Sequence, residues 1–330
     1  MRYPAPPYGV PLLTWLLLGC AAKVDRIALD RFVARGLSVG DLGEACTLGA
    51  GLRHALAGLT SESNPPRRAL VLAEATAALC AEREAWEADL GTARARRAVA
   101  TGGDAAAVTD AVTNADRWHA EAAARFERAW SQAEGHWGPI GQDCPRIRAG
   151  DEIAWVVGLV AGTLALLHDK SAGSPLGVPT DRLGQVARGA NCVDDAAWYH
   201  IPSALQAAAW ATIPGSGPAG LDPWAKLEEA ALAGETGGLR VARALEVRIA
   251  ANAGRDDVLA RGIRAHAAAL SERASVADLA LLDEYARWIS LHESDLLWTA
   301  ATGHRTPTFG QLPSDASPLP LTPEFDPFSP

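Results

Sequence analysis

Hydrophobic residues recur at spacings of three and four along most of the chain, which is the period of one face of an α-helix. Runs that alternate apolar and polar residues between hairpin turns, the pattern of β-strands, are missing. Ala, Leu, Glu and Arg, all good helix formers, dominate the periodic stretches. The pattern predicts an all-α fold with helices over the following segments: 41–59, 66–98, 104–134, 152–168, 179–190, 194–211, 222–234, 238–251, 255–270 and 276–298.

Local signals refine these boundaries. Asp41 followed by Glu44 is a capping-box arrangement, and Asp104 is placed to cap the helix that carries Trp118 and Trp130. Pro202 lies inside a periodic stretch and is expected to kink that helix.

One segment differs from the others because it is apolar on all sides. Residues 152–168 read EIAWVVGLVAGTLALLH, and such a helix belongs at the centre of a bundle. Gly158 and Gly162, four residues apart, would let a neighbouring helix approach closely. We therefore expect the other helices to pack around this one.

Successive helices form pairs of roughly 30 to 40 residues joined by short turns, the rhythm of helical-hairpin repeats. The prediction is a helical domain over 20–302 of degenerate tetratricopeptide-like hairpins; a compact helical domain without repeats is the alternative. The segment 303–330 has no periodicity and is rich in proline, so it is predicted to be a disordered tail.

The N-terminus suggests export. Val10 to Gly19 is an apolar run of signal-peptide length, and Leu17-Leu18-Gly19-Cys20 resembles the lipobox of bacterial lipoproteins. The resemblance implies cleavage after residue 19, lipid attachment at Cys20 and contact with the membrane only through that anchor. Ala21 favours the outer membrane, facing the periplasm. An ordinary secretory signal and a buried helix with an unmodified cysteine are the alternatives.

Five cysteines are present, so lipidation of Cys20 would leave four in an oxidising compartment. Cys46 and Cys80 lie at equal distances on either side of a turn between two helices, where a disulfide is geometrically feasible. Cys144 and Cys192 flank a second helical pair. The prediction is two disulfides, Cys46–Cys80 and Cys144–Cys192, against the alternative of four buried thiols.

Charge and motifs exclude several functions. The formal net charge of −9 argues against binding to nucleic acid. Gly215 to Gly220 matches G-x-G-x-x-G, but a helical pattern precedes it where a nucleotide site needs a strand. The histidines form no close metal pair, and no nucleophile motif is present. We therefore expect no catalytic residues, no cofactor and no metal.

Aromatic residues are the remaining signal. Several aromatic residues and one histidine fall on helices expected to lie close together, so they are candidates to line a ligand cavity: Trp155, Trp198, Tyr199, His200 and Trp210. Core packing is the alternative for these residues. Asp195 with His200 is a candidate acid–base pair, for which helix capping is the alternative.

The order of features from Asn64 to Trp298 resembles the TatT family, the lipoprotein component associated with TRAP transporters. The resemblance rests on Asn64-Pro65 opening a long helix, FERAW at 126–130, ANCVDDAAWYHIPSAL at 190–205 and the segment 220–263. It implies an all-helical fold with cryptic tetratricopeptide-like repeats. It further implies a homotrimer with a cavity in each protomer, docking to a periplasmic solute-binding protein, and a hydrophobic ligand.

Three functions remain in view at this point. The first is a non-enzymatic periplasmic lipoprotein of the TatT kind, and the second is a generic helical adaptor of the cell envelope. The third is an enzyme whose site includes Asp195 and His200.

Overall fold

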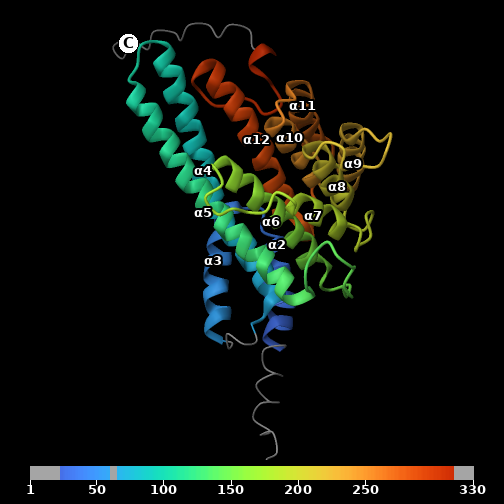
Figure 1. Cartoon of the computed structure of the whole chain (residues 1–330). Helices are drawn as coiled ribbons and strands as arrows, with labels where there is room; N and C mark the ends of the chain where they lie inside the picture. The colour runs from blue at the N-terminus through green and yellow to red at the C-terminus, as the bar shows by residue number, and fades with distance from the viewer. Residues whose placement is uncertain (1–22, 60–64, 316–330) are drawn as a thin grey trace, which may run out of the picture. The chain divides into compact units, whose positions relative to one another are not determined.

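The computed structural model describes residues 23–59 and 65–315, and its description of side chains leaves out 31–34 and 59. Within these ranges the chain forms eleven α-helices and no β-strand, which confirms the all-α fold class (Figure 1). The helices are α2 (Ala34–Leu37), α3 (Leu42–Leu59), α4 (Arg67–Ala100), α5 (Ala105–Trp137), α6 (Glu152–Ser171), α7 (Arg182–Ala190), α8 (Ile201–Thr212), α9 (Pro223–Gly237), α10 (Val241–Asn252), α11 (Asp256–Glu272) and α12 (Ala280–Thr302). A π-helical stretch, Ala28–Val33, and two short 3-10 turns, Ala277–Leu279 and Pro313–Asp315, complete the elements.

The contacts group the described residues into two compact units, where the sequence predicted one domain over 20–302. The first unit comprises 23–59, 65–82, 119–194 and 277–281, and the second comprises 83–118, 195–276 and 282–315. The long helices α4 and α5 supply turns to both units.

Helix α6 forms the core of the first unit. Its apolar sequence is buried as predicted, and the ring of Trp130 occupies the space where Gly162 lacks a side chain. A Cβ atom on Gly162 would lie 2.6 Å from Cζ3 of that ring, and one on Gly158 would lie 3.0 Å from Cβ of Ala133. The two glycines therefore allow the close approach of α5.

Among the described residues, α6 is the one helix long and apolar enough to cross a bilayer by those two criteria. However, 83% of its most apolar window is buried inside the structure. Burial of that extent is what a core helix requires, since an apolar surface removed from water stabilises the fold in proportion to its area.

Both predicted disulfides are present in the first unit. Cys46 of α3 is bonded to Cys80 of α4 with their Cα atoms 5.3 Å apart, and Cys144 is bonded to Cys192 with a Cα separation of 5.2 Å. The alternative of four free thiols is therefore wrong. The first bridge lies one helical turn from Gly49, where α3 and α4 come so close that a Cβ atom would lie 2.7 Å from the backbone nitrogen of Ala77.

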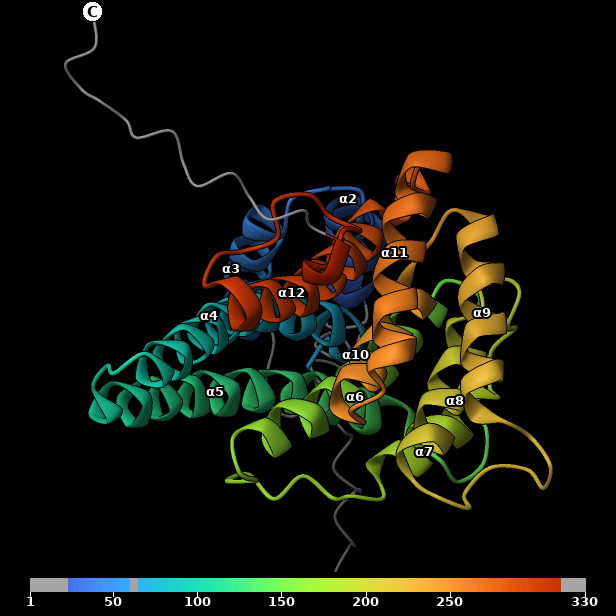
Figure 2. The same ribbon diagram turned by 90° about the horizontal axis from the view of Figure 1, so that it is seen from above.

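In the second unit, helix α10 is surrounded by α8, α9 and α11 (Figure 2). Every residue from Val241 to Ala250 is buried, and three of these are charged. Each has a partner on a different element: Arg243 with Glu235 of α9 at 2.7 Å, Glu246 with Arg261 of α11 at 3.2 Å, and Arg248 with Glu293 of α12 at 2.5 Å.

The predicted caps are in place. Asp41 Oδ1 accepts from the backbone N–H of Glu44 at 2.8 Å, and Asp104 Oδ1 accepts from that of Ala106 at 2.9 Å. These bonds satisfy N–H groups that the first turn of a helix leaves without a partner. The sequence had also placed the first helical break after Leu59, where α3 ends.

The prediction for Pro202 was wrong. Helix α8 begins at Ile201, so Pro202 lies in its first turn and does not kink it. A first-turn N–H has no intrahelical acceptor, and proline therefore costs little there. Residues 195–200, which lie within the predicted helix 194–211, form turns.

The predicted tail boundary also needs correction. Residues 303–315 belong to the second unit: Leu312, only 6% exposed, joins a cluster with Val247, Val258 and Ile263, and Phe309 lies beside it. The proline content suggested disorder, but these apolar contacts, the Arg305–Glu87 ion pair and the bond from the Thr306 N–H to Asp295 hold the segment. Residues 316–330 lie outside the described part of the chain.

Substituting alanine at two glycines of α3 separates close packing from helix propensity. Gly49→Ala is expected to lower the free energy of unfolding by about 1–3 kcal/mol, since the added methyl group meets the backbone of α4. Gly51→Ala, with no atom within 4 Å of the new Cβ, is expected to raise it by about 0.5–1 kcal/mol. Urea denaturation of both variants measures this, and equal effects at the two positions would contradict the packing argument.

His266 should make stability depend on pH. It is completely buried with Nδ1 2.8 Å from Ser290 Oγ, and burial, reinforced by the positive charges of Arg240 and Arg243, lowers its pKa to about 3. The unfolded chain, with a histidine pKa of 6.5, binds a proton that the folded chain excludes between pH 3 and 6.5. Stability therefore rises with pH across this window, by about 1.4 kcal/mol per pH unit from this residue.

Urea unfolding of the wild type and of His266→Gln between pH 4.5 and 7 tests this expectation. The variant should lose that contribution to the slope, whereas His54→Gln, at an exposed position, should keep it. Parallel curves for His266→Gln and the wild type would refute the assignment.

Candidate ligand-binding site

A half-open cavity of about 240 Å³ lies in the second unit between α4, α12 and the segment that follows α12. Each helix contributes a stripe of residues at i, i+3 or i+4, and i+7, which is one helical face. The stripe on α4 runs from Arg83 to Leu90, and that on α12 runs from Trp288 to Asp295. Arg305 and Thr306, from the segment assigned to the tail, complete the lining.

Trp86 forms the inner wall of the cavity. Its indole is 5% exposed and lies nearly parallel to the rings of Tyr285, at a centroid distance of 6.3 Å, and His292, at 5.2 Å. His292 Nε2 is 3.4 Å from a carboxylate oxygen of Asp89. Trp288, on the opposite helix, donates its indole N–H to Glu284 at 2.7 Å. Both tryptophans are thereby held in fixed orientations.

The polar groups of the lining come from three elements. Arg305 pairs with Glu87, and the backbone N–H of Thr306 donates to Asp295 Oδ1 at 2.9 Å. The Thr306 hydroxyl is 2.9 Å from Ser294 Oγ. An apolar cavity with a few fixed polar groups is the usual form of a small-molecule site.

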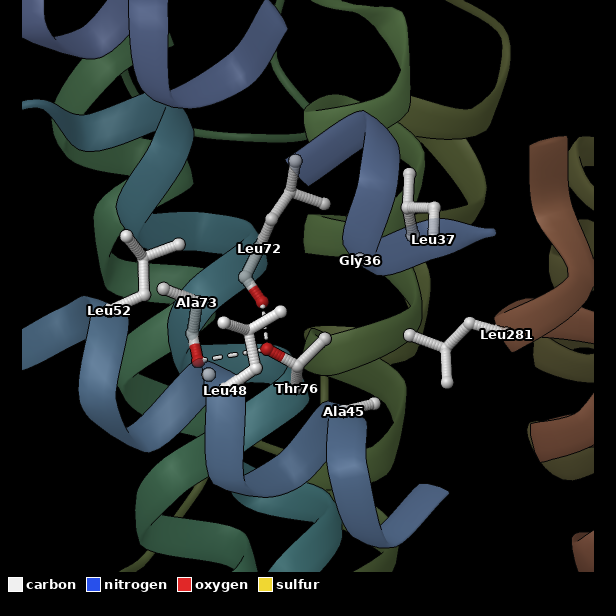
Figure 3. Close-up of a pocket in the computed structure, with 10 residues that line it drawn as sticks. Gly36, Leu37, Ala45, Leu48, Leu52, Leu72, Ala73, Thr76 and Leu281 are labelled. Carbon is white, nitrogen blue, oxygen red and sulfur yellow. Dashed lines mark hydrogen bonds between the residues drawn. The ribbon is translucent and has the colours of Figure 1, made fainter. Parts of the chain in front are cut away.

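The hollow drawn in Figure 3 is a poorer candidate. It lies in the first unit beside the crossing of α3 and α4, and its walls are almost entirely aliphatic, among them Leu48, Leu52 and Leu72. Its volume of about 30 Å³ is that of one water molecule. The single hydroxyl there, of Thr76, already donates within its own helix to Leu72 O and Ala73 O. A hollow of this volume is too small to enclose a molecule of the size of benzene.

Of the five residues predicted to bind a ligand, Trp155 belongs to the first unit. Its ring is 1% exposed, its indole N–H donates to Gly189 O at 3.0 Å, and the edge of Trp137 packs against it at 5.3 Å. These contacts account for the whole side chain as part of the core.

The other four, Trp198, Tyr199, His200 and Trp210, belong to the second unit and are half-buried around α8. Tyr199 and His200 have φ angles of 51° and 61°, a left-handed conformation that non-glycine residues seldom adopt. The conformation is accommodated by α9, where Gly234 and Gly237 leave room for the carbonyl and the ring of Tyr199. None of the four lines the cavity between α4 and α12.

The structure brings together the predicted pair Asp195 and His200, and adds Ser203. His200 Nδ1 and Ser203 Oγ are 2.7 and 2.6 Å from the same oxygen, Asp195 Oδ2, while the backbone N–H of Ser203 donates to Oδ1 at 2.8 Å. Burial opposes ionisation of this carboxylate, but the bonds from Ser203 and His200 outweigh it and lower the pKa of Asp195.

The connectivity differs from that of a catalytic relay. In a relay the histidine lies between the carboxylate and the hydroxyl and takes the hydroxyl proton. Here the carboxylate lies between the other two groups, and it satisfies an N–H of the first turn of α8. The arrangement suits capping of a helix behind a strained turn.

A second buried polar cluster, which the sequence analysis did not predict, lies in the first unit. His119 Nδ1 is 2.8 Å from His168 Nδ1, whose other nitrogen is 2.9 Å from Glu82 Oε1. One of the two facing nitrogens must carry a proton for the other to accept. The three residues connect α4, α5 and α6, and no cluster suited to a metal ion occurs among the described residues.

Comparison of the chain with family models, with curated proteins and with solved structures finds no match.

Sequence reasoning missed the cavity between α4 and α12 because its two stripes are about two hundred residues apart. A signal was nevertheless present. Trp86 and Trp288 each lie on a periodic helix with an arginine or aspartate one or two turns away on the same face. What the sequence does not contain is the information that these two faces meet.

Removing the Asp195 carboxylate tests its capping role. Asp195→Ala is expected to lower the free energy of unfolding by about 1–2 kcal/mol, the usual effect of losing a helix cap. Ser203→Ala, which keeps the backbone bond, should lower it by about 1 kcal/mol. Asp110→Ala, an exposed position within α5, should cause no loss. A fully stable Asp195→Ala protein in urea denaturation would exclude the capping role.

Proposed function

We propose that this chain is a non-enzymatic binding protein of an oxidising compartment outside the cytoplasm, anchored by lipid at Cys20. In this proposal the cavity between α4 and α12 holds a small molecule. The observation that carries the proposal is the cavity itself: about 240 Å³, with a tryptophan fixed on each of two helices. A cavity of about 150 Å³ is already enough for benzene, so this one has room for a larger organic molecule.

The two disulfides support the assignment to an oxidising compartment outside the cytoplasm. Both bridges form between cysteines far apart in the sequence, and such bonds persist where thiols are not kept reduced. Cys20, the fifth cysteine, lies outside the described residues, so its lipidation rests on the lipobox-like sequence. Export, lipidation and disulfide formation are mutually consistent.

The arrangement of Asp195, His200 and Ser203 supports the non-enzymatic part of the proposal. The one predicted acid–base pair has its carboxylate engaged in capping, with Ser203 bonded to that carboxylate instead of to His200. This arrangement supports a binding role over a hydrolytic one.

The resemblance to the TatT family extends the proposal to partners. On that basis the chain would face the periplasm from the outer membrane, form a homotrimer, dock a periplasmic solute-binding protein and carry a hydrophobic ligand. The all-helical fold is compatible with such a protein, and the degenerate tetratricopeptide-like repeats belong to the same proposal.

A helical adaptor is the second candidate, favoured by a broad groove between α9 and α11. The groove measures about 650 Å³. Its apolar lining consists of three alanines of α11 and Leu232, which is 53% exposed, and its polar lining is Glu235, Thr236, Glu272 and Arg273. Small side chains on a helix leave room for another helix. A groove of this kind fits a protein segment better than a small molecule.

Native mass spectrometry of the full chain, purified from the membrane fraction, tests the main proposal. We expect a protein that begins at an acylated Cys20 and carries a non-covalently bound small molecule. Leu291→Trp, which fills the cavity, should lose the small molecule. Leu176→Trp, at an exposed position of the first unit, should retain it.

Two results would count against the proposal. An unmodified Cys20 would exclude the lipid anchor. A small molecule retained equally by Leu291→Trp would exclude the cavity as its binding site. Recovery of a protein partner without any small molecule would favour the adaptor.

A further inference from the structure

The cavity between α4 and α12 contains two charges of opposite sign that the described residues leave without an ion-pair partner. These are Asp295, on α12, and Arg83, on α4. The other ionisable groups of the lining lie beside a partner: Glu87 pairs with Arg305, and His292 Nε2 is 3.4 Å from an Asp89 oxygen. The unpaired charges therefore bear directly on what the cavity binds.

Asp295 is the more informative of the two because it is buried. The residue is 8% exposed, and its one hydrogen bond in the described structure comes from the Thr306 N–H to Oδ1. No Lys, Arg or His of the described chain lies within ion-pair distance of it. A mostly buried carboxylate without a nearby cation is destabilising, since burial removes much of its hydration without adding a countercharge. A cationic group on a ligand would supply that countercharge.

Arg83 lies at the exposed rim of the same cavity. It is one turn before Glu87 on α4, but Glu87 pairs with Arg305, and no described carboxylate lies within ion-pair distance of Arg83. A guanidinium group offers five N–H donors in a planar fork that matches a carboxylate. A ligand carboxylate at the mouth of the cavity would meet it.

Beside these charges the cavity has apolar and aromatic walls. Trp86 and Trp288 face the cavity from the two helices, with Leu90 and Leu291 beside them. Tryptophan faces attract cations as well as apolar groups, so they favour an ammonium-bearing ligand with an apolar body. The volume limits that body to about the size of one aromatic side chain.

We propose that the cavity binds a small zwitterion of the α-amino acid type. Its ammonium group pairs with Asp295, its carboxylate with Arg83, and its apolar or aromatic side chain packs against Trp86 and Trp288. The inference deepens the proposed function and rests on it, because it assigns a ligand class to the same cavity. It narrows the hydrophobic ligand that the TatT resemblance implies to one whose apolar body also carries an ammonium and a carboxylate group.

Four probes that share a phenylethyl group distinguish the contributions of the two ligand charges to affinity. L-phenylalanine carries both charges, phenethylamine carries only the ammonium, 3-phenylpropionate carries only the carboxylate, and 3-phenylpropan-1-ol carries neither. Titration calorimetry with the full chain at pH 7 measures their affinities. We expect L-phenylalanine to bind at least tenfold more tightly than either singly charged probe, and the alcohol to bind most weakly.

Two substitutions assign each charge to its residue. Asp295→Asn keeps an oxygen for the Thr306 N–H and should weaken L-phenylalanine and phenethylamine at least tenfold while leaving 3-phenylpropionate unchanged. Arg83→Gln should weaken L-phenylalanine and 3-phenylpropionate and leave phenethylamine unchanged. Arg94→Gln, an exposed arginine further along α4, is the matched control and should change none of the affinities.

The outcomes separate the inference from the proposed function. If the neutral alcohol binds as tightly as L-phenylalanine, the zwitterion assignment is wrong but the cavity remains a binding site. If none of the four probes binds while native mass spectrometry still finds a small molecule lost in Leu291→Trp, the ligand class is likewise wrong and the proposed function stands. If neither experiment finds a ligand, both are overturned.

Discussion

The second unit depends on the pairing of charges inside a protein core. Helix α10 is buried over ten successive residues, yet it carries Arg243, Glu246 and Arg248. A buried charge destabilises a fold unless an opposite charge and hydrogen bonds compensate for the lost water. The compensating groups come from three neighbours, α9, α11 and α12, so the position of each neighbour is tied to one charge of α10. Arg240, also fully buried, adds a second tie to α12 through Asp283 at 2.5 Å.

The sequence predicted most of the helices but not this core. Apolar periodicity and capping residues are local properties, which is why the limits of α3 and the central burial of α6 were predictable. The two disulfides followed from hairpin geometry and the parity of the cysteines. The burial of α10 was not predictable, because charged residues in a periodic helix usually indicate a solvent-exposed face. Their partners lie 8 to 45 positions away, and no local pattern records those pairings.

The site shows the same division between local and long-range information. Trp155 and the aromatic residues near α8 are predicted to line a cavity because their helices are expected to pack near one another. In the structure these residues instead pack in the core, form a left-handed turn or lie at the capped start of α8. The cavity instead joins stripes near residues 83–90 and 288–295, and completes them with a segment that its prolines had suggested was disordered. The register of two distant helix faces is a tertiary property.

The Asp295 carboxylate takes part in both the cavity and the packing of the segment that follows α12. It faces the cavity, and it also accepts the backbone N–H of Thr306, which holds the segment leading to the C-terminus. Arg305, beside Thr306, reaches across to Glu87 on α4. The seating of this segment and the charge within the cavity are therefore thermodynamically linked. A group that neutralises the Asp295 carboxylate also changes the acceptor of the Thr306 N–H, so the conformation of residues 303–315 depends on whether the cavity is occupied.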